Sequence, residues 1–275
     1  MMMNRGIVAL ACVWIAAAPA AAQDLSRPDT AAQRSGRLFT RRDLLIAGAF
    51  AAGAAAMFPV DHTLANHLQD STVQANHFLS HTATGARLLG SPGALVLPVA
   101  TFAAGRVLRK PQMADLGLHT AESVLMAQAI TSVAKAATGR ARPVEDPGHP
   151  FNYRFGRGLR NDRFSSMPSG HTSSAFAAAS AAASEVGEHW PRHRTLAGIT
   201  LYSAASLVGL SRMYNNKHWA SDVVVGAAVG TFSGWKVVGY THSHRNNRLD
   251  RFLLGTRVAP APGGGMALDW SSLRR

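Results

Sequence analysis

Six apolar segments rich in Ala and Gly constrain the fold of this chain more than any other feature. They lie at roughly 44–58, 88–105, 118–137, 171–187, 195–210 and 221–240. Ala is the strongest helix former, and small residues let helices pack closely. Only 16% of the 275 residues are charged, whereas ordinary soluble domains carry about 25%. The sequence therefore predicts an all-α bundle of about six helices.

The regions around these segments predict four parts. They are a signal peptide (1–22), a linker (23–43), the helical domain (44–240) and a C-terminal tail (241–275). Residues 1–22 combine a charge at Arg5 with an apolar run and a small-residue cleavage pattern, although an uncleaved anchor would have the same start. The tail holds Gly263-Gly264-Gly265 and then an alternating stretch, which fits a short irregular segment or a hairpin.

The location of the bundle stays open at this stage. Most of the apolar segments are shorter than the roughly 20 residues that span a bilayer, and only 221–240 is clearly long enough. A membrane-embedded bundle and a soluble periplasmic bundle both fit. Arg41-Arg42 before the first segment resembles a twin-arginine export signal. We favour a first helix with these arginines at its polar end, because a signal already lies upstream.

The charge balance indicates an anionic partner. The net charge is +13, which favours phospholipid headgroups, phosphorylated substrates or nucleic acid. Residues 151–164 interleave aromatic side chains with Arg. Because an exported protein rarely meets nucleic acid, we expect an entrance loop for an anionic lipid and no nucleic-acid partner. The only cysteine, Cys12, lies in the predicted signal, so the mature chain would have no disulfide and no thiol nucleophile.

Three separated clusters carry residues suited to binding phosphate. The first holds Lys135 and Arg142, with Pro143 directly after. An Arg fork can bind two phosphoryl oxygens, and Lys adds a compact positive charge. The second is Pro168-Ser169-Gly170-His171, which precedes a strong helix-forming stretch. Free backbone N–H groups at a helix start favour anions, and Ser169 and Gly170 would lie at that start.

The third cluster supplies a nucleophile and another cation. His218 and Asp222 are four residues apart and share a helix face, so the carboxylate can accept the imidazole N–H and leave the other ring nitrogen free to attack phosphorus. Arg212 adds a third cation, and His171 can protonate the departing oxygen. The positive charge of these residues predicts a site that needs no metal and no cofactor.

At these residues the chain resembles the type 2 phosphatidic acid phosphatase and vanadium haloperoxidase superfamily. The shared pattern is K-x6-RP, then PSGH, then SR-x5-H-x3-D, within residues 135–222. The resemblance implies a helical bundle with the site between its helices. It implies His218 as the nucleophile that forms a phosphohistidine, His171 as the general acid and Asp222 as the residue that orients His218. The resemblance also implies a set of phosphoryl-binding residues: Lys135, Arg142, Ser169, Gly170 and Arg212.

The sequence therefore predicts a phosphatase of the bacterial envelope that hydrolyses a phosphate monoester or pyrophosphate of a membrane lipid. A soluble periplasmic acid phosphatase of broad specificity is the main alternative. A vanadium-dependent haloperoxidase and a non-catalytic envelope protein are further alternatives. Among the remaining histidines, His77 and His81 have a metal-like spacing, but without a third ligand they are interpreted as surface residues. His242 and His244 are interpreted as part of a solvated basic end.

Overall fold

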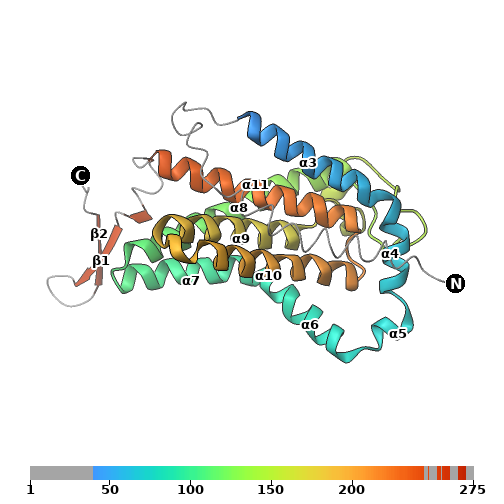
Figure 1. Ribbon diagram of the computed structural model, residues 1–275, viewed down its shortest axis with the longest axis horizontal. Helices are drawn as coiled ribbons and strands as arrows, with labels where there is room; N and C mark the ends of the chain where they lie inside the picture. The colour runs from blue at the N-terminus through green and yellow to red at the C-terminus, as the bar shows by residue number, and fades with distance from the viewer. Residues whose placement is uncertain (1–39, 245–246, 248–252, 255, 261–265, 271–275) are drawn as a thin grey trace.

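The computed structural model describes residues 40–244, 247, 253–254, 256–260 and 266–270. The predicted signal peptide and nearly all of the predicted linker lie outside these residues. The described helices are α3 (Arg41–Met57), α4 (Asp61–Leu68), α5 (Ser71–Gln74), α6 (His77–Leu88), α7 (Ala94–Val107), α8 (Pro111–Thr138), α9 (Gly170–His189), α10 (Arg194–Tyr214) and α11 (Ala220–Ser243). The long helices run side by side as a bundle (Figure 1), which confirms the all-α prediction.

The six apolar segments correspond to α3 and α7 through α11. The sequence interpretation missed the helices of residues 61–88, because this stretch has few apolar runs. Its short helices begin at polar caps: the Asp70 side chain accepts from the N–H of Thr72, and Asn76 accepts from that of Leu79. A kinked segment, η2 (Leu89–Gly93), then connects α6 to α7, with an extended backbone at Ser91.

Small residues bring α11 and α9 together at the centre of the bundle. A Cβ atom added at Gly230 of α11 would lie 2.3 Å from the carbonyl oxygen of Ser173 on α9. One turn further on, a Cβ atom at Gly234 would lie 2.8 Å from the carbonyl oxygen of Ala177. Such distances exclude any side chain, so the Gly and Ala content sets how closely these helices approach. Helices α8 and α10 pack on the other sides of α9.

The first helix, α3, belongs to the bundle. Thr40 caps it, and its Asp43 side chain forms a 2.5 Å ion pair with Lys236 of α11. These contacts favour the first-helix interpretation of the Arg41-Arg42 stretch over an export signal. The last three residues of the predicted linker therefore form the first turn of α3.

The two ends of the helical domain differ slightly from the predicted boundaries. Helix α11 continues to Ser243, three residues beyond the predicted end of the domain. In the tail, β1 (Thr256–Pro260) pairs antiparallel with β2 (Met266–Trp270), with Val258 opposite Leu268. The hairpin alternative is therefore confirmed for the described part of the tail (Figure 1).

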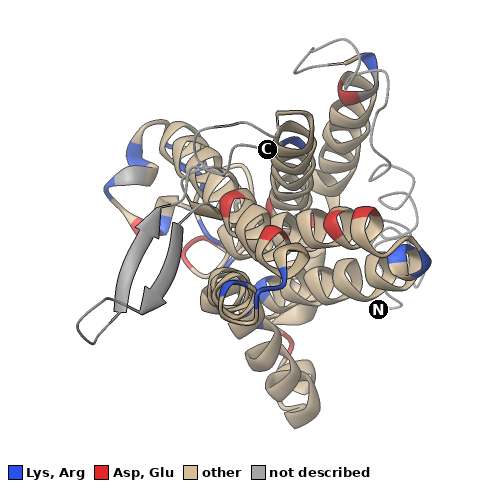
Figure 2. Ribbon diagram, turned by 90° about the vertical axis from the view of Figure 1, so that its left-hand side faces the viewer, with Lys and Arg blue, Asp and Glu red and all other residues tan. Residues whose placement is uncertain are grey.

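Among the described residues, three helical stretches are long and apolar enough to cross a membrane. They are 43–68, 77–107 and 220–243. The sequence interpretation recognised only the last of these, because it treated the others as separate short segments. Most of the ribbon is free of charge in the end-on view, where Lys, Arg, Asp and Glu occupy only a few turns and loops (Figure 2).

Candidate active site

The three predicted clusters meet at one end of the bundle. The residues involved are Lys135 near the end of α8, Arg142 in the loop after it, Ser169 and Gly170 at the start of α9, Arg212 in the last turn of α10, and His218 and Asp222 around the start of α11. Helix α8 ends where α9 and α11 begin, because Gly139 adopts a left-handed conformation that stops α8.

Two contacts show how closely the clusters approach. A Cβ atom at Gly170 would lie 3.7 Å from Cε of Lys135, so the Lys side chain passes directly over the start of α9. The N–H of Ser169 donates to the carbonyl oxygen of Asp222 at 3.1 Å. Ser169 is fully buried, and its hydroxyl accepts from Thr172 at 2.8 Å. The second and third clusters are thus hydrogen-bonded to one another.

The loop between α8 and α9 positions two of the cations. Lys135 Nζ donates to the carbonyl oxygen of Ser165 at 2.7 Å. Arg142 donates through Nη2 to the carboxylate of Asp162 at 2.6 Å and to the hydroxyl of Ser165 at 2.9 Å. Partial loss of hydration opposes ionisation of the largely exposed Asp162 carboxyl, but the hydrogen bond from Ser165 and the charge of Arg142 lower its pKa below the usual value. Asp162 therefore stays charged and anchors Arg142.

The geometry of His218 leaves one ring nitrogen available. Its Nδ1 atom lies 2.7 Å from the carbonyl oxygen of Ser166. Since a carbonyl oxygen can only accept, Nδ1 carries the proton, and Nε2 of the neutral ring holds a lone pair. The residue is buried, and burial together with the neighbouring cations Lys135, Arg142 and Arg212 lowers the pKa of its imidazole well below the usual value. His218 is therefore neutral at pH 7.

Asp222 does not accept the His218 proton directly, in contrast to the sequence prediction. Its Oδ2 atom lies 3.9 Å from Nδ1 of His218. The carboxylate instead accepts from the Ser166 hydroxyl at 2.5 Å, the Trp219 N–H at 2.9 Å and Arg140 at 2.6 Å. The start of α11 explains the difference, because Asp222 in the first turn folds back onto its own N-cap residue. It thus holds the Ser166 segment, and that backbone orients the ring.

Arg212 and His171 complete the cluster. Arg212 is buried at the end of α10, and its Nε atom has no hydrogen-bond partner among the described residues. His171 is half-buried in the first turn of α9. Burial and the positive charges of Arg212, Lys135 and Arg142 lower the pKa of its imidazole, and burial and the same three cations lower that of His218. The electrostatic field of the same three cations therefore acts on both predicted catalytic imidazoles.

Sequence reasoning missed the residues that support this cluster from behind. Arg140 is fully buried and binds the carboxylates of both Asp61 and Asp222. Asp61 in turn accepts from the backbone and hydroxyl of Ser221 at the start of α11. Arg140 and Arg142 lie two residues apart in one irregular loop, and the pattern that singled out Arg142, an arginine directly before Pro143, does not include Arg140. No sequence pattern indicated a role for Asp61, because it lies far from the three clusters in the chain.

Comparison with known proteins identifies the domain that holds the cluster. Residues 116–246 match the PAP2 superfamily. This part of the chain is therefore similar to that superfamily. It contains every candidate site residue named above and three of the long helices, α9, α10 and α11, complete. The superfamily resemblance drawn from the sequence pattern is thereby confirmed.

Two bacterial relatives of this chain are named lipid A 1-phosphatases. The protein of Porphyromonas gingivalis is 50% identical over 84 residues, which cover 30% of this chain and 18% of that protein. The protein of Rhizobium etli is 31% identical over 123 residues, which cover 44% of this chain and 47% of that protein. The matches thus span less than half the length of either relative.

A solved structure shares the fold. It is a transmembrane PAP2 type phosphatidylglycerolphosphate phosphatase from Bacillus subtilis, with a TM-score of 0.57 and 22% sequence identity. The match covers 75% of this chain and 98% of that one. At this identity the likeness shows the arrangement of the helices.

The histidines that the sequence analysis placed outside the phosphate-binding clusters differ in their surroundings. His77 and His81 are exposed on α6, which agrees with their interpretation as surface residues. His242 was wrongly interpreted as part of a solvated end. Its ring reaches inward from α11 and lies 2.8 Å from the carboxylate of Glu185 on α9. The sequence could not show this contact, because the two residues are brought together only by helix packing.

Proposed function

We propose that this chain is a phosphatase that hydrolyses a phosphate monoester or pyrophosphate of a membrane lipid, through a phosphohistidine at His218. The observation that carries the proposal is the state of His218. Its Nδ1 proton is donated to the carbonyl oxygen of Ser166, its Nε2 lone pair is free, and the positive charges of Lys135, Arg142 and Arg212 act on the ring. A neutral imidazole among fixed positive charges is suited to attack a phosphoryl group whose oxygens those charges bind.

The proposed reaction has two steps. The Nε2 atom of His218 attacks phosphorus, and the bond from phosphorus to the lipid oxygen breaks while His171 donates a proton to that oxygen. A water molecule then attacks phosphorus, gives a proton to His171 and releases inorganic phosphate from His218. Lys135, Arg142 and Arg212, with the Ser169 hydroxyl and the backbone N–H of Gly170, bind the phosphoryl oxygens in both transition states.

Two features favour a lipid substrate and a place in the bacterial inner membrane. The first is the set of three helical stretches of membrane-spanning length and hydropathy. The second is the exposure of large apolar side chains along α7, where Val96, Leu97 and Val99 are each at least 50% exposed. A soluble protein rarely presents such a continuous apolar surface to water. We propose that the phosphate-binding end faces the periplasm.

The named relatives suggest which lipid to test first. Both are called lipid A 1-phosphatases, so a glycosyl phosphate on a lipid is the leading substrate class. Arg154, Arg157 and Arg160 are exposed in the loop that leads to α9. These arginines suit the predicted entrance loop, because they can attract the anionic headgroup before it reaches the cluster.

The decisive experiment measures phosphate release in detergent micelles from a panel of substrates. The panel contains lipid A, phosphatidic acid, phosphatidylglycerol phosphate, an isoprenoid pyrophosphate and the soluble ester p-nitrophenyl phosphate. We expect release from at least one lipid and none from the His218→Ala variant. A preference for the soluble ester would favour a periplasmic acid phosphatase. Bromination that depends on added vanadate, without phosphate release, would favour a haloperoxidase.

A further inference from the structure

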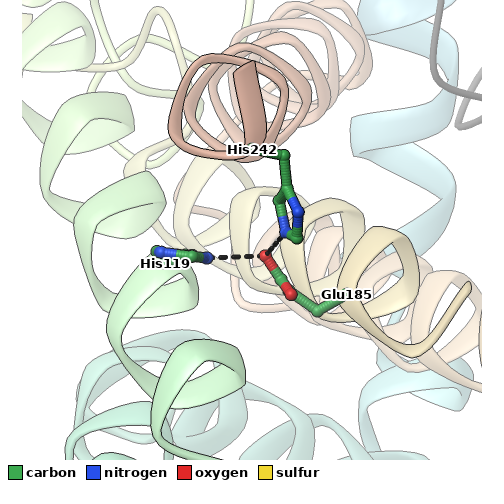
Figure 3. Close-up of side chains that lie close together, drawn as sticks. All are labelled: His119, Glu185 and His242. Atoms are coloured by element: carbon green, nitrogen blue, oxygen red, sulfur yellow. Dashed lines mark hydrogen bonds and ion pairs between the residues drawn. The ribbon is translucent and has the colours of Figure 1, made fainter. Parts of the chain in front are cut away.

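A second polar cluster lies at the opposite end of the helices that build the phosphate site. It consists of His119 of α8, Glu185 of α9 and His242 of α11, one residue from each helix (Figure 3). Both imidazole rings approach the same carboxylate. At a rise of about 1.5 Å per residue, the cluster lies roughly 20–30 Å along these helices from Lys135, His171 and Asp222. It is therefore separate from the candidate active site.

The three side chains place their ligand atoms around one point. Nδ1 of His119 lies 2.6 Å from Oε1 of Glu185, and Nε2 of His242 lies 2.8 Å from the same oxygen. All three ligand atoms lie within 4.8 Å of one another. The two rings are arranged edge to face, with centroids 5.7 Å apart.

A fourth donor lies beside them. Nε2 of His189, one turn after Glu185 on α9, is 3.2 Å from Oε2 of that carboxylate. Its ring centroid is 6.1 Å from that of His242. The cluster therefore gathers three imidazoles and one carboxylate. Asp115 of α8 is a nearby second carboxylate, with Oδ2 4.0 Å from Nε2 of His189.

The burial of Glu185 requires a positive partner. Its side chain is fully buried, and within the described part of the chain its ion-pair partners are His119, His189 and His242. No Lys or Arg pairs with it there. A carboxylate removed from water is costly unless a cation compensates its charge. Either protonated imidazoles or a bound metal ion can supply that charge.

We propose that His119, Glu185, His189 and His242 form a binding site for a divalent transition metal, with Zn²⁺ as the best fit. Three imidazoles and a carboxylate make a four-ligand tetrahedral set, in which Zn–N and Zn–O distances are about 2.0–2.2 Å. Such a set separates its ligand atoms by about 3.4 Å, so the hydrogen-bonded pairs of His119 and His242 with Glu185 open by less than about 1 Å when the ion enters. His189 is outside the group of ligand atoms that lie within 4.8 Å of one another, so its side chain must turn toward the ion to complete the set.

The position of the site defines its role. Four protein ligands leave no open position for substrate, which is typical of a structural zinc. The ion would connect α8, α9 and α11 at the end of the bundle opposite the candidate active site. It stabilises the folded bundle by binding only when the three helices are in place. This proposal is independent of the phosphatase activity proposed above.

The test uses the full chain in detergent, purified through a tag without histidine and stripped with a chelator. The protein is dialysed against ZnCl₂, and bound zinc is measured by plasma mass spectrometry. We expect about one zinc per chain and a thermal unfolding midpoint that rises by several degrees with zinc. Co²⁺ in place of zinc is expected to give the strong visible absorption of a tetrahedral complex.

Two variants separate metal binding from hydrogen bonding. His242→Gln and His119→Asn each keep an N–H that can donate to Glu185, but they lose the lone pair that binds a metal. We expect each to weaken zinc binding by about tenfold or more. The matched controls are His244→Gln, at the C-cap residue two positions after His242, and His77→Ala in the exposed pair on α6. Both controls are expected to bind zinc as the unchanged protein does.

Three results would overturn the proposal. They are no tight zinc in the unchanged protein, equal zinc binding in His242→Gln, and loss of zinc in His77→Ala. If the cluster variants do not fold, the Co²⁺ spectrum of the unchanged protein decides, since a spectrum without tetrahedral bands rejects the site. Phosphate release is measured in parallel, and a chain that binds zinc but releases no phosphate rejects only the proposed function.

Discussion

At the scale of single residues, the two arginines of the loop after α8 illustrate how position determines role. The Arg140 side chain is fully buried and paired with two buried carboxylates, those of Asp61 and Asp222. Arg142 is paired with Asp162, whose side chain is 85% exposed. The first arginine holds the start of α11 in place, and the second can release its partner for a phosphoryl group.

Replacing Arg140 is therefore expected to reduce mainly the stability of the fold, whereas replacing Arg142 is expected to reduce mainly the rate of the reaction. Arg140→Met leaves two buried carboxylates without a counter-charge, which lowers the free energy of unfolding by about 3–5 kcal/mol. Arg142→Met breaks a pair with an exposed partner, which costs about 1 kcal/mol or less, but lowers kcat by about 10²–10³-fold. Thermal unfolding and phosphate release from each variant check the prediction. Equal loss of stability in both would contradict it.

The pKa of His218 predicts the pH dependence of the proposed reaction. The pKa in the folded protein is lowered well below the usual value, so the neutral, nucleophilic form persists as the pH falls below 6.5. We expect the rate loss caused by protonation of His218 to appear well below pH 6.5 in kcat/KM, which reports the free enzyme.

The measurement must separate the enzyme from the substrate, because phosphate esters also titrate near pH 6. Profiles for two substrates whose phosphate pKa values differ provide this control. If the pH at which the rate falls changes with the phosphate pKa of the substrate, that fall reports titration of the substrate. A limb that stays near pH 6.5 for both substrates would show that His218 is not shifted.

At the scale of elements, the close contact between α9 and α11 connects packing to the active site. The start of α9 carries Ser169 and Gly170, and the start of α11 carries His218. The Gly residues of α11 allow its backbone to touch that of α9. Any separation of the two helices would therefore move the proposed nucleophile away from the proposed phosphate-binding backbone.

Two glycines of the same helix test this connection. Gly230→Ala places a Cβ atom 2.3 Å from the carbonyl oxygen of Ser173, so the helices must shift, and the free energy of unfolding falls by about 1–3 kcal/mol. We expect kcat to fall with it. Gly239→Ala meets nothing within 4 Å, and the gain in helix propensity keeps stability equal or raises it by up to about 1 kcal/mol. Unfolding midpoints and turnover of both variants are compared, and an unchanged Gly230→Ala protein would refute the argument.

At the scale of the whole molecule, the apolar surface of α7 indicates what surrounds the bundle. Leu97 lies within a stretch of membrane-spanning length and is 58% exposed. In a bilayer this side chain contacts lipid, whereas in water it contributes little to stability. The same substitution therefore has different consequences in the two environments.

Leu97→Arg is expected to cost about 2.5–3.5 kcal/mol of insertion free energy if the helix lies in lipid. In a soluble bundle the change is expected to stay within about 0.5 kcal/mol. Leu97→Ala is the matched control, because it removes apolar area without adding charge. Membrane fractionation after alkaline extraction measures the outcome. An arginine variant that accumulates, fractionates and unfolds like the alanine variant would favour the soluble bundle.

The sequence by itself determined the helical class, the six long helices and the three clusters whose residues meet at one end of the bundle. These features are local, since helix propensity, apolar runs and short spacings are written along the chain. Only the tertiary structure decided which partners the residues have. Arg140 binds Asp61, which lies 79 residues earlier in the chain, Ser166 rather than Asp222 accepts the proton of His218, and His242 turns inward to Glu185. Such pairs depend on how closely the helices approach and on their rotation about their own axes, and no spacing within a single helix specifies either quantity.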